Sequence, residues 1–353
     1  MSYEGEEPIE VNGKKVVAFK ESGEWDIPEG VESVDVLVVG GGGGGGSRYG
    51  GGGAGGLIFK PNHEIQGTSP LTITVGSGGA GASADGGQGT DGGNSFFENL
   101  TAIGGGGGGG QSPTSGRDGG SGGGSGGTDN SDNGEGIQPN QSGDSGTFGY
   151  GNDGGEMASG GGGGTAAGGG GGGAGEVGQT SSASNPGDGG DGLKEVTINS
   201  INYNFASIFG DTYGEKIDND VWFAGGGGGS GAETDNASEG GKGGGADGKD
   251  GNDSQTPNNA LENTGGGGAG GPWDGDGLAA SSGGSGIVIL AYEDPFVPPT
   301  NPTELEPQLE FEKFTFTGSS LDFDLEPMLP AGSTVTTING VIQTSNEGVI
   351  QTK

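Results

Sequence analysis

The sequence predicts a mostly irregular, all-β protein, built as a bundle (sandwich) of packed polyglycine-II helices on a small β-platform, with a small C-terminal β module. Of the 353 residues, 97 are glycine and only 26% are hydrophobic, so an ordinary apolar core of matching size is not available. Many glycines form uninterrupted tracts, and strand-like segments bound them. The longest tracts are residues 40–46, 104–110, 160–164, 168–173, 225–229 and 265–268.

A single glycine tract is typical of a flexible linker, because glycine loses the most conformational freedom on folding and has no side chain to bury. Glycine can also adopt an extended helix with about 3 residues per turn and about 3.1 Å rise per residue, without internal hydrogen bonds. Several such helices side by side satisfy one another's N–H and C=O groups. The recurrence of the tracts favours this bundle. Disorder, which low hydrophobicity and high net charge also predict, is the alternative.

The platform is predicted from runs that are rich in β-branched residues. Residues 15–19 and 34–39 are two such runs, and residues 25–30 supply a turn between them. Short strands are expected at 57–59 and 71–75, and the last strand of the domain at 287–292.

The connectors between tracts alternate in character. Those at 57–75, 94–103, about 148–158 and 193–224 carry aromatic and β-branched residues, whereas those at 47–49, 111–147, 176–186 and 232–264 are mostly polar. If consecutive tracts run up and down, the apolar connectors gather on the platform and the polar ones at the opposite end. Loops on a rigid scaffold often carry binding function. The predicted contact residues are Arg48, Tyr49, Arg117, Asp118, Asn130, Asn140, Gln179, Asp235, Asn236 and Asn258.

Four segments are expected along the chain. Residues 1–14 are an N-terminal tail, 15–292 the glycine-rich domain, 293–307 a proline-rich semi-rigid linker and 308–353 a small β module. Within the module, Phe311 to Phe316 and Leu321 to Leu325 alternate like strands, and Ile338-Asn-Gly-Val341 predicts a hairpin. A module this small often needs a partner for stability. It is therefore a candidate for attachment or oligomerisation, for example as a trimer.

Charge and composition exclude several classes of partner. The formal net charge is −36, from 48 acidic and 12 basic residues, so nucleic acid and anionic membranes are disfavoured. Without cysteine, the chain has neither disulfides nor thiolate metal sites. We see no secretory signal after Met1 and no run of about 18 apolar residues. If the protein works outside a cell, another route, such as assembly into a virion, is expected.

No enzyme, cofactor or metal site is predicted. Gly123-Gly-Ser125-Gly-Gly127 matches a nucleophile elbow, but composition alone generates such matches, and the sole histidine, His63, is expected in a surface loop. No lysine is followed by serine or threonine, which excludes a Walker A loop. Carboxylates abound without a spacing that singles out the pair needed by a polysaccharide depolymerase.

Two further patterns have structural interpretations. The Asp-Gly clusters at 188–191, 247–253 and 274–276 could supply oxygens to calcium, yet they lack the EF-hand spacing, so solvated turns are favoured. Arg48, Tyr49, Trp222 and Trp273 flank glycine tracts, where packing against the flat glycine faces is favoured over ligand binding.

An ordered set of motifs resembles the glycine-rich domain found in bacteriophage tail-fibre and adhesin proteins, over about residues 15–292. The set begins with Trp25-x-x-Pro28 and Val34-x-Val36-x-Val38-Val39 before the first tract. It continues with Gly51-Gly-Gly-Ala-Gly-Gly-Leu-Ile58, Ile73-Thr-Val-Gly-x-Gly-Gly-Ala-Gly81, Gly92-Gly-Asn-Ser95, Ala102-x-Gly104-Gly, Ala224-Gly-Gly-Gly-Gly and Gly283-Gly-Ser-Gly-Ile-Val-Ile289-x-x-Tyr292. The segment 193–224 is longer than the family pattern, and the module after residue 295 is not part of it.

The resemblance implies a sandwich of polyglycine helices whose distal loops contact a host surface. We therefore expect a virion fibre or adhesin of a tailed bacteriophage. Its partners would be a host receptor, either a glycan or an outer-membrane protein, and other fibre or tail proteins. The alternative is a purely structural virion component, such as a head or neck fibre or a capsid decoration, anchored by residues 308–353.

Overall fold

The protein is mostly β with a few short helices, as the all-β and irregular composition predicted. The computed structural model describes residues 5–83, 86–112, 114–127, 132–157, 166–182, 185–231, 236–249, 256–272 and 278–294, and the strands 333–338 and 341–346. The chain divides into two compact units, Met1–Val297 and Pro298–Lys353. Within the described residues, no helix is long and apolar enough to cross a membrane.

A six-stranded sheet forms the base of the first unit, with its strands in the order β1-β2-β14-β4-β5-β9. Its central strand β14 pairs antiparallel with both β2 and β4. The bounds are Ile9–Val11 for β1, Lys14–Phe19 for β2, Ile287–Glu293 for β14, Ser33–Val39 for β4, Leu57–Glu64 for β5 and Gly149–Tyr150 for β9. The strands predicted at 15–19, 34–39, 57–59 and 287–292 are confirmed. β2, β4 and β14 read as near-continuous apolar runs because both faces of this sheet are covered.

A second sheet covers one face of the first. It contains four strands in the order β3-β6-β7-β8, with bounds Gly23–Trp25, Leu71–Thr74, Ser95–Phe97 and Leu100–Ala102. Trp25 and Phe97 from this sheet are buried against residues such as Val36 and Leu290 of the larger sheet. The connector 94–103 is therefore a hairpin that contributes to the apolar core.

The segment 193–224 covers the opposite face of the six-stranded sheet. It consists of the hairpin β10 (Glu195–Ile198) and β11 (Ile201–Asn204), the helix α2 (Phe205–Phe209), and the hairpin β12 (Glu215–Ile217) and β13 (Asp220–Trp222). The fully buried ring of Phe59 in β5 lies 5.3–6.1 Å, between centroids, from the rings of Tyr203, Phe205 and Phe209. This aromatic cluster fixes the segment on the sheet.

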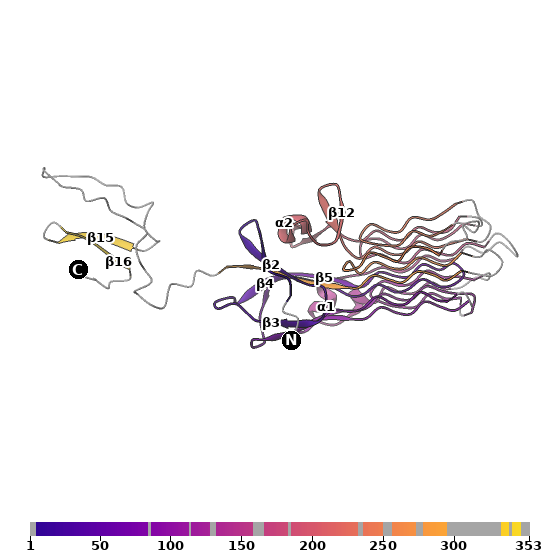
Figure 1. Ribbon diagram of the computed structural model, residues 1–353, viewed down its shortest axis with the longest axis horizontal. Helices are drawn as coiled ribbons and strands as arrows, with labels where there is room; N and C mark the ends of the chain where they lie inside the picture. Colours follow the sequence, from indigo (N-terminus) through magenta and orange to yellow (C-terminus); the bar gives the residue numbers. More distant parts are fainter. Residues whose placement is uncertain are drawn as a thin grey trace. The chain divides into compact units, whose positions relative to one another are not determined.

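Extended glycine-rich segments continue from the sheets as a side-by-side array (Figure 1). We call this the glycine array; it comprises the described parts of residues 40–56, 76–93, 104–137, 151–192 and 224–286. The segments run back and forth between a sheet end and a far end. Their backbone groups bond to neighbouring segments, so lateral hydrogen bonds replace an apolar interior.

The segment 40–46 at the centre of the array changes its hydrogen-bond partner with a period of three residues. Its successive N–H groups donate to segments 50–56, 90–93 and 281–284 in turn, over 2.8–3.0 Å. Its carbonyls accept from three further segments, 79–82, 105–108 and 268–271. Segment 40–46 therefore has six neighbours, and no position on it faces solvent.

The close approach of these backbones explains why the centre of the array is glycine. A Cβ atom added at Gly42 would lie 2.5 Å from the carbonyl carbon of Gly266, and closer still to its oxygen. Six-sided contact leaves no direction into which a side chain could turn. Only glycine fits, as at the crowded axis of collagen.

Outer segments of the array carry polar side chains, and many of these accept hydrogen bonds from the backbone of the next segment. Nine carboxylate or amide oxygens accept an N–H group in this way, over 2.7–3.0 Å. The pairs are Asp91–Gly107, Asn94–Gly104, Asp118–Glu135, Asp153–Gly136, Asp188–Glu239, Asp191–Lys242, Asp247–Gly240, Asn259–Ser282 and Glu262–Ser285. Part of the acidic excess thus satisfies backbone donors at the edge of the array.

We predict that Asp188→Ala lowers the unfolding free energy by about 1 kcal/mol, because the N–H of Glu239 loses its acceptor at a position that water can reach. Asp188→Asn keeps an acceptor oxygen and should change the unfolding free energy by less than about 0.5 kcal/mol. Urea unfolding measures both variants, and hydrogen exchange at the Glu239 amide localises the effect. Equal losses of unfolding free energy for the two variants would contradict the role of Asp188 as a hydrogen-bond acceptor at the edge of the array.

The interpretation of 111–147, 176–186 and 232–264 as simple polar connectors is wrong. Most of their described residues form outer segments of the array, such as 116–120 and 238–242, with backbone bonds to other segments. The helices η1 (Gln138–Asn140) and α1 (Asp144–Thr147) return the chain to the sheets. Outer segments can be polar because some of their side chains face solvent rather than another backbone.

Gln138 joins the glycine array to the sheets. Its side chain is fully buried; Oε1 accepts from the N–H of Ile103, and Nε2 donates to the carbonyls of Thr101 and Ser145, over 2.8–3.2 Å. It thereby satisfies the edge of β8 where the sheet ends.

In the second unit, β15 (Ser333–Ile338) and β16 (Val341–Asn346) form an antiparallel hairpin. Ile338 pairs with Val341, which confirms the hairpin predicted from Ile338-Asn-Gly-Val341. The strands predicted at 311–316 and 321–325 lie outside the described residues.

Candidate functional site

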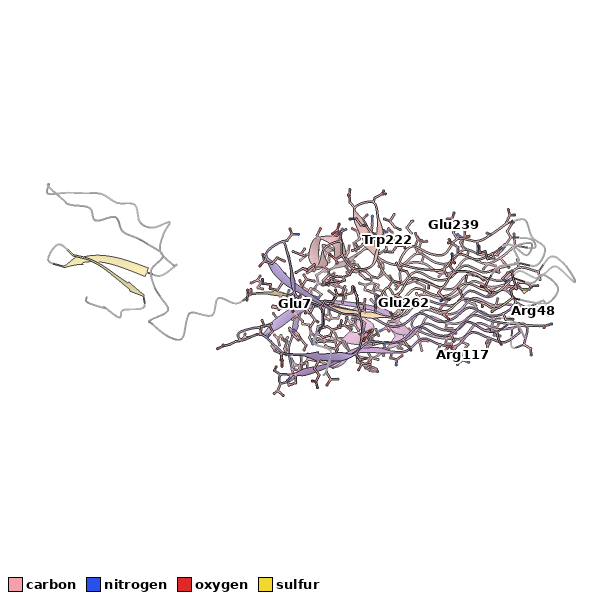
Figure 2. The ribbon with its side chains drawn as sticks, viewed as in Figure 1. Glu7, Arg48, Arg117, Trp222, Glu239 and Glu262 are labelled. Atoms are coloured by element: carbon pink, nitrogen blue, oxygen red, sulfur yellow. The ribbon has the colours of Figure 1, made fainter. Side chains whose placement is uncertain are left out.

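The turn at Arg48 and Tyr49 lies at the far end of the glycine array, where Figure 2 labels Arg48. Both residues have positive φ angles, 72° and 101°. The N–H of Arg48 donates to Gly271, its carbonyl accepts from Gly127, and the carbonyl of Tyr49 accepts from Ser230. The turn therefore joins three other segments by backbone bonds, at Gly127, Ser230 and Gly271.

Tyr49 is buried, with 3% of its surface exposed, and it packs with Met157 and Ala166. Arg48 is half-buried. The ring of Tyr49 therefore packs inside the far end, against Met157 and Ala166, and is not exposed as the predicted contact role requires. Trp222, another flanking aromatic residue, lies below the ammonium groups of Lys194 and Lys242, 5.3 and 5.1 Å from its ring centroid. Trp273 lies outside the described residues.

Arg117 and Asp118 lie along the side of the glycine array. The Arg117 guanidinium binds both carboxylate oxygens of Asp91, over 2.6 and 2.7 Å, and this hydrogen bonding raises the pKa of Arg117. Asp118 is exposed, and its Oδ1 accepts from the N–H of Glu135. Both side chains connect outer segments.

The remaining predicted contact residues do not form one cluster. Asn236 donates from Nδ2 to Oδ1 of Asn185, 2.6 Å away. Gln179 and Asn258 are exposed on outer segments, whereas Asn140 is exposed in η1 at the sheet end. Asn130 and Asp235 lie outside the described residues. The structure therefore places Arg48, Tyr49 and Asn236 at the far end of the glycine array, and the other described contact residues along its side or at the sheet end.

The prediction that His63 is a surface loop residue is wrong. His63 belongs to β5 and is 1% exposed, and its Nε2 lies 2.7 Å from Oε2 of Glu98. The other Glu98 oxygen accepts from the N–H groups of Gln66 and Gly67. Glu98 thereby attaches the β7–β8 turn to β5 and to the loop that follows it. The pairing also satisfies two buried polar groups, each of which would be costly to bury alone.

The Asp-Gly cluster at 188–191 is an extended outer segment rather than the predicted solvated turn. Asp188 and Asp191 each accept a backbone N–H from the segment 239–242, as described above. Residues 274–276 lie outside the described residues. Across the described ranges, no group of three or more His, Asp or Glu side chains is arranged to hold a metal ion.

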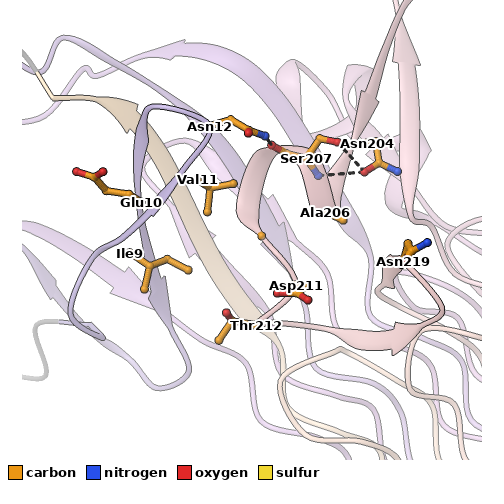
Figure 3. A pocket seen from close by; sticks show the side chains of 11 residues that line it. Ile9, Glu10, Val11, Asn12, Asn204, Ala206, Ser207, Asp211, Thr212 and Asn219 are labelled. Atoms are coloured by element: carbon orange, nitrogen blue, oxygen red, sulfur yellow. Dashed lines mark hydrogen bonds between the residues drawn. The ribbon is translucent and has the colours of Figure 1, made fainter.

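An open cleft of about 610 Å³ lies beside the sheet, between the β1–β2 hairpin and the segment 204–219 (Figure 3). Its residues were not among those predicted from the sequence. No local pattern could reveal them, since the two walls are nearly 200 residues apart in the chain. The lining residues are Ile9, Glu10, Val11, Asn12, Asn204, Ala206, Ser207, Gly210, Asp211, Thr212 and Asn219.

Asp220, beside this cleft, accepts hydrogen bonds from Lys194 and Asn204 and so connects the β12–β13 hairpin to the β10–β11 hairpin. A hydrogen bond from Lys194, followed by one from Asn204, lowers the pKa of the Asp220 carboxyl. A carboxyl with a depressed folded-state pKa stabilises the fold above its unfolded pKa, and this contribution disappears as the pH falls through the folded value. We therefore expect tryptophan fluorescence from Trp222 to change at acidic pH before global unfolding, and Asp220→Asn to show the altered signal already at neutral pH. Identical acid profiles for the two proteins would contradict this role.

Together, these features define a predominantly β protein in which a laterally hydrogen-bonded glycine array extends from two covered sheets. A family model described as "Glycine-rich domain" matches residues 18–293, and the chain belongs to this family. A search of curated proteins found no match.

Proposed function

We propose that the glycine segments are polyglycine-II helices packed as a lattice, and that this lattice is the shaft of a fibre or adhesin of a tailed bacteriophage. Two observations support the helix assignment. Hydrogen-bond partners of segment 40–46 repeat every three residues, which matches a helix of three residues per turn. Each residue of that segment also bonds between segments rather than within its own.

The far end of the lattice is the proposed contact surface for the host cell. The observation that carries this proposal is the construction of the far end: Arg48, Tyr49, Gly127, Ser230 and Gly271 are joined by backbone bonds, and polar stretches of sequence, such as 128–131 and 232–236, follow. A rigid scaffold that presents adjacent polar loops is a common arrangement for recognition. The ligand would be a glycan or an outer-membrane protein.

Competition for adsorption tests this proposal. The purified full chain should reduce adsorption of the phage that encodes it to sensitive bacteria. Asn236→Trp places a bulky group beside Asn185 at the far end and should abolish competition. Asn140→Trp is the matched control, because Asn140 is also an exposed asparagine but lies at the sheet end.

A purely structural virion component predicts a different result. In that case the full chain coats particles and leaves adsorption unchanged, and neither tryptophan variant has an effect. Equal competition by Asn236→Trp and the unmodified chain would show that this part of the protein is not the contact surface.

A further inference from the structure

The cleft between the β1–β2 hairpin and the segment 204–219 has the chemistry of a ligand site, and we propose that it binds a neutral saccharide. This site is separate from the proposed contact surface at the far end. Its volume of about 610 Å³ lies within the range of about 300–1,000 Å³ typical of small-molecule sites.

The cleft is locally neutral although the chain is strongly acidic. Of its lining residues, only Glu10 and Asp211 are charged. Glu10 pairs with Lys15 over 2.7 Å, and Asp211 pairs with Lys216. Both carboxylates are thereby compensated, so the cleft offers neither a cation site nor an anion site.

Uncharged polar side chains line much of the opening. Thr212 and Asn219 are exposed, and within the described residues neither side chain makes a hydrogen bond to the protein. Asn204 is already engaged, since it accepts from Ser207 and donates to Asp220. Thr212 and Asn219 therefore present a hydroxyl group and an amide group that remain available to a ligand.

Three of the lining residues, Ile9, Val11 and Ala206, are apolar, and Gly210 adds no side chain beside Val11. Gly210 has a φ angle of 79°, and a Cβ atom there would approach Val11 to 3.1 Å. A lining that combines a few apolar side chains with neutral hydrogen-bonding groups matches a sugar ring, which has apolar C–H faces and hydroxyl groups that both donate and accept.

One hydrogen bond joins the two walls of the cleft. Nδ2 of Asn12 in the β1–β2 turn donates to the carbonyl of Ser207 in α2, over 2.8 Å (Figure 3). The aromatic cluster around Phe59 holds α2 on the sheet independently of this bond. The two walls are therefore positioned before a ligand binds, which lowers the entropic cost of binding.

Nuclear magnetic resonance titration of the full chain tests the site, with side-chain amide signals of asparagine as the readout. The probes are galactose and N-acetylglucosamine as neutral sugars, glucuronate as an anionic sugar and glucosamine as a cationic sugar. We expect at least one of the neutral sugars to shift the Asn219 and Asn12 signals. The dissociation constant should be on the order of 1 mM and should not depend on the salt concentration. Glucuronate should bind at least about tenfold more weakly, because the surrounding protein is acidic.

The double variant Thr212→Ala/Asn219→Ala should weaken this binding at least about tenfold, since it removes two hydrogen-bonding groups. Thr72→Ala/Asn99→Ala is the matched control, because it removes the same two side-chain types at exposed positions of the four-stranded sheet, outside the cleft, and it should leave the affinity unchanged. Far-ultraviolet circular dichroism of both variants establishes that they are folded.

Three results would overturn the proposal. These are the absence of shifts at Asn12 and Asn219 with either neutral sugar up to about 50 mM, unchanged affinity in the Thr212→Ala/Asn219→Ala variant, and salt-sensitive binding of glucosamine alone. The last result would show a non-specific acidic surface. Because Asn236→Trp tests the far end and the double variant tests the cleft, failure of one proposal does not affect the other.

Discussion

Replacing Gly42 with alanine is expected to lower the unfolding free energy by at least about 3 kcal/mol, at or beyond the upper end of the usual cost of overpacking. The added Cβ would lie 2.5 Å from the carbonyl carbon of Gly266. Gly266 cannot move away from the added Cβ without breaking a hydrogen bond, because its carbonyl accepts from the N–H of Gly284 in the neighbouring segment. A shift of one segment would disturb the hydrogen bonds of its neighbours. Urea unfolding of the full chain measures the loss.

The matched control is Ala80→Ser, which also adds one heavy atom to a short side chain in the glycine array. Ala80 is exposed on the outer segment 76–82. Its substitution should change the unfolding free energy by less than about 0.5 kcal/mol. If Gly42→Ala and Ala80→Ser were equally stable, the segments would not be packed backbone against backbone. Loss of amide protection throughout 40–56 only in Gly42→Ala would support the close-packed arrangement.

Phe59→Ala is expected to lower the free energy of unfolding by about 3–5 kcal/mol, the usual effect of truncating a buried aromatic residue. Phe59 is fully buried, and its ring contacts Tyr203, Phe205 and Phe209 from the segment that covers the sheet. The resulting cavity would lie between β5 and α2. We expect the segment 193–224 to lose amide protection before the sheet does. Hydrogen exchange and urea unfolding measure both effects.

Phe96→Ala provides the control for Phe59→Ala. Phe96 belongs to β7, and 38% of its surface is exposed. It therefore buries less apolar area, and its truncation should cost clearly less than that of Phe59. A loss for Phe59→Ala no greater than that for Phe96→Ala would contradict the role of the aromatic cluster in holding segment 193–224.

Local patterns were sufficient to predict the main strands. The β-branched run of β4 and the Ile287–Glu293 run of β14 could be predicted as strands, because β-branched side chains fit a pleated and buried surface. The two-residue Asn-Gly signal likewise predicted the register of Ile338 with Val341. These features depend on neighbours in the sequence.

The candidate sites could not be predicted in the same way. Asn140 and Asn236 are both exposed asparagines in polar stretches, and only the path of the chain places Asn140 in a helix at the sheet end. Tyr49 is polar-flanked in the sequence but buried by Met157 and Ala166, which are more than 100 residues away. His63 similarly appears to be a loop residue until Glu98 is brought beside it.

The amino-acid sequence by itself determined that the fold could not rest on an ordinary apolar interior, since 97 glycines and a hydrophobic content of 26% leave too little apolar surface to bury. Only the tertiary structure decided which segments are neighbours and which polar residues face solvent. Glycine tracts are nearly identical to one another, so their order in the array depends on where the sheets and the segment 193–224 place their ends. The acidic residues at the edge show the same dependence: Asp188 satisfies the N–H of Glu239 only because folding brings their segments together.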